Sequence, residues 1–125
     1  MGLDMYAFST KAKPKTEVDF ETKNFQPDEV HYWRKHPNLH GWMQNLYDEK
    51  GGTSSEFNGD CVVLTNDDLD CIEHELKQWD LPETRGFFFG TDENNEEELK
   101  DDLEFVEKAR EQIKKGNTVY YTSWW

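Results

Sequence analysis

The sequence contains no long apolar segment and only two cysteines, Cys61 and Cys71, among its 125 residues. A membrane-spanning helix needs about 20 predominantly apolar residues, and no stretch of this chain approaches that length, so we expect no membrane association. The opening residues also lack the apolar run of a secretion signal. Because structural disulfides belong mainly to secreted proteins, we expect both thiols to be reduced and structural in a protein of the cytoplasm.

The motifs of common metal and cofactor sites are missing too. Neither a P-loop nor a GxGxxG motif occurs. His36 and His40 have the i,i+4 spacing of zinc ligands, but Pro37 stands where an HExxH metalloprotease needs glutamate. Residues 92–103 do not fit a calcium loop, because Glu97 occupies the glycine position. We therefore expect no metal and no cofactor.

Apolar residues are scarce at 34%, whereas aromatic residues are abundant at 14%. Each buried aromatic side chain removes about 150–250 Å² from water, so we expect a core built from a few large rings. This aromatic content argues against a disordered chain. The length favours one domain, so residues 1–125 are expected to form a single unit.

Local patterns predict four strands and three helices. Alternation, aromatic content and short apolar runs predict strands over residues 4–10, 29–34, 61–64 and 118–124. Apolar residues at 3–4 spacing predict helices over residues 37–49, from Thr65 toward Pro82, and over 94–115. The aromatic block at residues 86–90 is either a further strand or a pocket wall. The predicted fold class is α+β, with a single small sheet of three to five strands packed with three helices, mostly on one side.

The ends of two helices carry specific signals. Thr65 and Asp68 fit a capping box at the start of the second helix, and Gly116 suits the C′ position after the third. The third helix is expected to bury an apolar stripe and to expose acids on its opposite side. The stripe consists of Leu99, Leu103, Val106, Ala109 and Ile113, and the exposed acids are Glu97, Asp101 and Glu104.

Negative charge is concentrated in one part of the chain. The formal net charge is −13, and residues 66–111 hold 17 Asp and Glu against 5 Lys and Arg, a net charge of −12. Such a surface would repel phosphates, so direct nucleic-acid binding is not expected. It could instead bind a partner protein with a basic surface or mimic nucleic acid; the plainer alternative is a well-solvated helical face. The candidate partner-binding residues are Glu96, Glu97, Asp101, Asp102 and Glu104.

The segment from Trp33 to Trp42 gathers cations, histidines and rings at a strand-to-helix junction. A helix N-terminus offers free N–H groups and the positive end of the helix dipole, and flanking cations can hold a phosphate or a carboxylate. The alternative is that the tryptophans belong to the core and that the cations balance the acidic helices. The candidate residues for binding a small anionic ligand, such as a nucleotide, are Trp33, Arg34, Lys35, Asn38, His40 and Trp42.

The two interpretations of this junction predict different geometries. A functional site should have Arg34 and His40 facing one concavity, walled by residues 87–89 and by Tyr120 or Trp124. A structural junction should instead be filled by rings, with its polar groups paired internally.

Several motifs together resemble those of one protein family. They are MGLDMY at residues 1–6, YWRK at 32–35 followed by Asn38, His40 and Trp42, LPET at 81–84 leading into GFFFG at 86–90, DLEF at 102–105, and YYTSW at 120–124. The family consists of small proteins carried by tailed bacteriophages and prophages, and the resemblance spans nearly the whole chain. Some members are labelled phosphoglycerate kinase, but this chain is too short for that enzyme and has no nucleotide loop.

The resemblance implies a phage accessory protein that acts in the cytoplasm of a bacterial host. The leading hypothesis is a non-enzymatic protein that binds and modulates a host factor, in host defence or transcription, through its acidic surface. The alternatives are a binding protein or small enzyme for a phosphorylated ligand or nucleotide at residues 33–42, and a DNA-mimic inhibitor.

Overall fold

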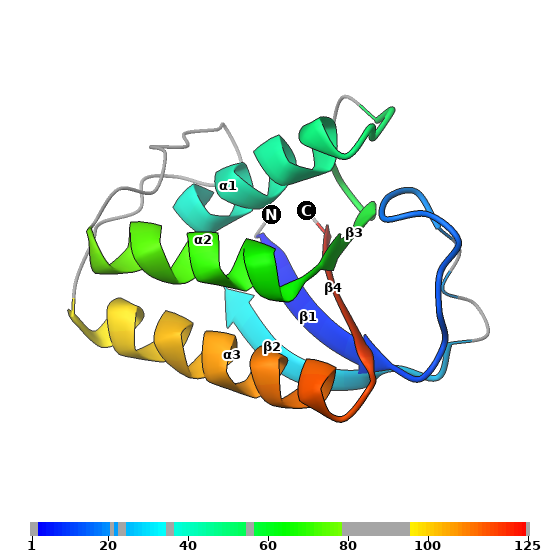
Figure 1. Ribbon diagram of the computed structural model, residues 1–125. Helices are drawn as coiled ribbons and strands as arrows, with labels where there is room; N and C mark the ends of the chain where they lie inside the picture. The colour runs from blue at the N-terminus through cyan, green and yellow to red at the C-terminus, as the bar shows by residue number, and fades with distance from the viewer. Residues whose placement is uncertain are drawn as a thin grey trace.

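The computed structural model describes residues 3–20, 22, 25–34, 37–54, 57–78 and 96–124, without the side chains of Arg34, Pro37, Glu96 and Glu98. A four-stranded sheet packs with three helices (Figure 1), which confirms the predicted α+β class. In chain order the elements are β1 (Asp4–Thr10), β2 (Asp28–Arg34), α1 (Pro37–Glu49), β3 (Cys61–Leu64), α2 (Asn66–Lys77), α3 (Glu96–Lys114) and β4 (Thr118–Trp124). The aromatic block at residues 86–90 lies outside the described residues.

The sheet is antiparallel throughout, with the strand order β2-β1-β4-β3. The last strand, β4, lies between β1 and β3, so that its Thr122 pairs with Tyr6 on one side and with Cys61 on the other. The register between β1 and β2 shifts between Ala7 and Phe8, as at a β-bulge. The centre of the sheet therefore forms only when the two ends of the described chain come together.

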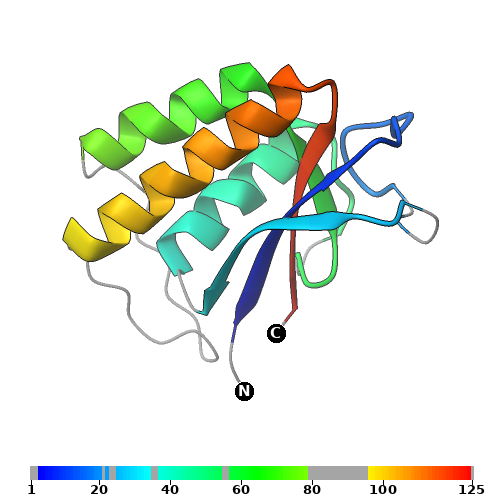
Figure 2. The same cartoon turned by 90° about the horizontal axis from the view of Figure 1, so that it is seen from below.

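All three helices cover one face of the sheet (Figure 2), and α2 and α3 lie side by side. Met5 and Ala7 of β1 are fully buried, whereas Tyr6 between them is partly exposed, because successive strand residues point to opposite faces. The interior is rich in large rings, as the composition predicts. The largest fully buried aromatic side chains are Tyr47, Phe57, Phe105, Tyr120 and Tyr121.

The predicted helix-end signals are confirmed. The Thr65 hydroxyl accepts a hydrogen bond from the Asp68 N–H at 3.2 Å, and the Asp68 carboxylate accepts one from the Thr65 N–H at 2.9 Å. After α3, Gly116 has a φ of 91°. The N–H groups of Gly116 and Asn117 donate to carbonyls in the last turn of α3, which completes a Schellman motif with Gly116 at C′.

The buried side of α3 is centred on Phe105, which the predicted apolar stripe did not include. Its fully or almost fully buried apolar residues are Phe105, Val106 and Ala109. Its partly buried apolar residues are Leu99, Leu103 and Ile113. The helix packs against both α2 and the sheet, so the apolar stripe divides between two neighbours. The outward acids Glu97, Asp101 and Glu104 are exposed, as predicted.

Both cysteines are free, as predicted. Cys61 lies buried on β3, where burial raises the pKa of its thiol. The prediction that Cys71 is structural is wrong, because this residue is exposed on α2. One helical step of about 100° separates it from the buried Ile72, so Cys71 lies beside the apolar stripe and outside the core.

Candidate functional site

The junction between β2 and α1 is mostly interior. Trp33 and Asn38 are 5% exposed and His40 is 1% exposed, whereas Trp42 is half-buried against the core. The described part of this junction therefore belongs to the core, as the structural interpretation predicts. Part of the predicted site lies outside the described residues: Lys35, the side chain of Arg34 and residues 87–89 of the expected wall.

His40 sits among rings that fill the space beside it. Its Nδ1 atom shares a 2.7 Å hydrogen bond with the Tyr121 hydroxyl, and its ring lies 5.1 Å from that of Phe57. Burial lowers the pKa of His40 to about 4, so the imidazole is neutral at pH 7. A neutral, enclosed imidazole supplies no positive charge for an anion. Of the expected wall residues, Tyr120 packs instead against Phe8 on the helix-free face of the sheet.

The burial of His40 predicts a loss of stability in mild acid. Between the unfolded pKa of 6.5 and the folded pKa of about 4, the unfolded chain binds a proton that the folded chain does not. The contribution of His40 is therefore complete above pH 6.5 and falls as the pH drops, by about 3 kcal/mol near pH 4. Urea unfolding at several pH values should show a steeper loss for the wild type than for His40→Gln. Parallel curves for the two proteins would contradict this assignment.

Asp102 was predicted to belong to the acidic partner-binding surface, and this prediction is wrong. It is only 1% exposed, and its Oδ1 atom accepts a 2.9 Å hydrogen bond from the Trp33 indole N–H. The Trp33 ring packs edge-on against Phe105 of the same helix at 4.7 Å. Phe105 is three positions after Asp102, which places both on the inward side of α3. Asp102 is therefore an internal acceptor that ties α3 to β2.

Three predicted acids do lie on the outer surface of α3: Glu97, Asp101 and Glu104, hereafter the acidic row. Asp101 is 50% exposed, and its carboxylate forms a 2.9 Å hydrogen bond with Nε2 of the buried His31 on β2. Glu104 is 59% exposed and pairs with Lys108 one turn later at 3.1 Å. The fifth candidate, Glu96, begins the helix, and its side chain lies outside the described residues. The acidic row thus lies on one face at successive spacings of four and three residues.

Charge along α3 follows the helix dipole. Residues 96–104 contain six acids and one base, whereas residues 105–114 contain two acids and three bases. Acids near the helix N-terminus and bases near its C-terminus are both favourable. In the second half, Arg110 contacts Asp70 of α2 at 2.6 Å and Glu73 of α2 at 2.9 Å. Its hydrogen bond lowers the pKa of Glu73, so the acids of α2 are partly neutralised, as Glu104 of the acidic row is by Lys108.

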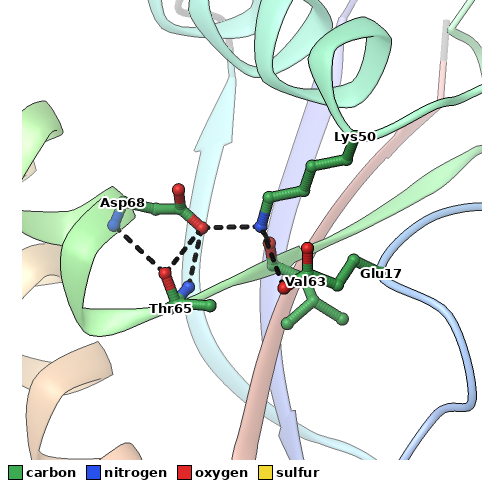
Figure 3. Close-up of polar contacts among 5 residues, drawn as sticks. All are labelled: Glu17, Lys50, Val63, Thr65 and Asp68. Atoms are coloured by element: carbon green, nitrogen blue, oxygen red, sulfur yellow. Dashed lines mark hydrogen bonds and ion pairs between the residues drawn. The ribbon is translucent and has the colours of Figure 1, made fainter.

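A polar cluster that the sequence analysis missed surrounds Lys50 (Figure 3). From the end of α1, Nζ of Lys50 donates to the Val63 carbonyl and to Oδ2 of Asp68, each at 2.6 Å, and lies 3.7 Å from Glu17. The same Asp68 oxygen accepts the Thr65 N–H of the capping box. The only sequence signal was the capping box itself, since nothing near Lys50 in the sequence indicates its partners.

The Lys50 cluster is suited to holding elements together. Its ammonium group has three donors, and three oxygens lie around it. The Lys50 and Asp68 side chains are only 11% and 15% exposed. A lysine engaged in this way joins the end of α1 to β3 and to the start of α2, and its nitrogen is not free to attack a substrate.

The described residues contain no group of three His, Cys, Asp or Glu side chains arranged to hold a metal ion. No helix in that part of the chain has both the length and the apolar character needed to cross a membrane. Comparison with protein families, with curated proteins and with solved structures finds no match to this chain.

Proposed function

We propose that this chain is a non-enzymatic binding protein that docks its acidic row onto a basic surface of a partner protein. The observation that carries the proposal is the exposure of Glu97, Asp101 and Glu104 along one face of α3, beside a core-facing side that is apolar. Lys100 and Lys108 lie on the same side of the helix, but the acids outnumber them, and an ordered row of acids provides a directional contact that scattered surface charge does not.

The surroundings of the acidic row support this role. Residues 96–104 of α3 alone hold six acids against one base, so the field near the start of this helix attracts a basic partner. The contact with His31 holds Asp101 in one position, which reduces the side-chain entropy that binding would remove. The resemblance to phage proteins would make the partner a host factor, and occupation of its basic surface would modulate its activity in defence or transcription.

The geometry favours this proposal over a phosphorylated ligand at the β2–α1 junction. His40 is neutral and enclosed, and Trp33 is committed to Asp102 and Phe105. These residues therefore stabilise the core in the described part of the junction.

Reversal of two acids in the row should abolish partner capture. We expect wild-type protein to retain a basic partner from bacterial host lysate at low salt, and to retain less of it once the Debye length falls to about 8–10 Å. The variant Glu97→Lys/Glu104→Lys should retain none, because two attractive contacts become repulsive. Affinity capture followed by gel analysis measures the difference.

The matched control is Asp48→Lys/Glu49→Lys, which changes the net charge equally at exposed positions of α1. It should retain the partner as the wild type does. Equal loss in both variants would attribute capture to net charge alone, and retention by the Glu97/Glu104 variant would overturn the proposal. Circular dichroism should show that both variants are folded.

A further inference from the structure

Two adjoining cavities lie where β1 ends, β2 begins and α3 ends, and the second meets the acidic row at Lys108, which pairs with Glu104. The first has a volume of about 240 Å³ and the second about 300 Å³. Ser9 of β1 and Asp28 of β2 line both of them. The first cavity by itself is smaller than typical ligand pockets of about 300–1,000 Å³, so it suits a small molecule.

The first cavity has one cation and one anion in its lining, Lys11 and Asp28. Both residues are exposed, and within the described part of the chain neither side chain makes a hydrogen bond or an ion pair, although Asp28 pairs with Ser9 in the sheet. Elsewhere on the surface, acids and bases commonly pair, as Lys108 does with Glu104. A cation and an anion that line one cavity without forming an ion pair are complementary to a ligand that carries one negative and one positive group.

The walls of the first cavity are held by internal bonds. The Thr10 hydroxyl donates to the Phe25 carbonyl at 2.8 Å, and Gln26 follows with a φ of 47°. Asn117 belongs to the Schellman motif after α3, and its side-chain N–H donates to Gln112 at 2.9 Å. The Phe25 ring stacks on Phe20 at 5.8 Å. These bonds hold the Thr10, Phe25 and Asn117 parts of the wall in place before a ligand arrives, which lowers the cost of binding.

We propose that this cavity binds a small zwitterion of the size of a free amino acid, with its ammonium group at Asp28 and its carboxylate at Lys11. The side chain of the ligand would extend into the second cavity. Charged residues of both signs line that space: Glu29, Lys108, Glu111 and Lys115. Across the two linings three acids face three lysines, so the site is locally neutral. It therefore favours a zwitterion over a doubly charged phosphate, which the net charge of −13 would also repel.

The proposal is tested by isothermal titration of the full chain with each of the twenty proteinogenic amino acids. At least one should bind at millimolar concentration or below. Its N-acetyl derivative and its methyl ester should each bind about tenfold more weakly, since a charge-assisted contact contributes about 1.5–3 kcal/mol. Lys11→Gln and Asp28→Asn should each produce a loss of the same size.

The matched control is Lys15→Gln, which removes a lysine from the same basic segment but not from either lining. It should bind as the wild type does. Absence of binding by all twenty amino acids would overturn the proposal. So would equal binding of either blocked derivative, or undiminished binding by Lys11→Gln or Asp28→Asn. Partner capture through the acidic row is measured separately, so either proposal can fail without the other.

Discussion

Replacement of Lys50 by methionine is expected to lower the free energy of unfolding by about 3 kcal/mol. The methionine keeps most of the apolar stem and removes only the ammonium group. Asp68 and the Val63 carbonyl then lose a donor at 2.6 Å in a site where Lys50 is 11% exposed (Figure 3). Breaking a buried ion pair by removing one partner costs about 3–5 kcal/mol, and the residual exposure places this value at the lower end. Urea unfolding at pH 7 measures it.

The control for this variant is Lys77→Met. Lys77 lies 3.5 Å from Glu73 on α2 and is 58% exposed. Exposed pairs of this kind contribute about 0–1 kcal/mol, so Lys77→Met should unfold close to the wild type. Similar losses in the two variants would show that the Lys50 cluster is a surface pair in solution and does not hold three elements together.

Gly52→Ala is expected to destabilise the fold by about 3 kcal/mol or more. An added Cβ would lie 2.1 Å from Cε1 of the Tyr47 ring, well inside van der Waals contact. Tyr47 is fully buried, and its hydroxyl accepts the N–H of Ser54 at 3.0 Å and donates to Asp19. The ring therefore has no free space to enter, and overpacking of a tight site typically costs 1–3 kcal/mol or somewhat more. Thermal unfolding followed by circular dichroism measures the loss.

The control variant Gly51→Ala measures the cost of an unfavourable backbone conformation without a clash against the Tyr47 ring. Gly51 has a φ of 95°, but a Cβ there would meet nothing within 4 Å. Its substitution should therefore cost about 1–2 kcal/mol, the strain of a left-handed conformation alone. A melting temperature of Gly52→Ala at or above that of Gly51→Ala would show that the Tyr47 ring moves aside.

Elements whose signals lie within a few residues could be predicted from the sequence. The helix Pro37–Glu49 has the predicted bounds, and the Thr65–Asp68 capping box and the Gly116 stop are confirmed. Each depends on atoms at most one or two turns apart, such as a side chain and an N–H three residues later. Residues 86–90 lie outside the described residues, so their predicted role stays a prediction.

The candidate sites could be predicted only in part. The helical period places Glu97, Asp101 and Glu104 on the outer face of α3. It did not reveal that Asp102 is internal, because its partner is the Trp33 indole, 69 residues away. The function of the junction was also open from the sequence, since the same rings and polar groups suit a pocket or a core. The structure decides for the core at Trp33, Asn38 and His40.

Local patterns along the chain were enough to predict the class of fold, the order of strands and helices and most of their ends. Periodic burial and neighbouring side chains specify these features locally. Three long-range features had no local signal and became visible only in the fold: β4 lies between β1 and β3, Lys50 meets Asp68, and His40 pairs with Tyr121, 81 residues away. Such contacts join segments that share no local pattern. They arise when burial of the rings brings those segments together and each enclosed polar group must find a partner.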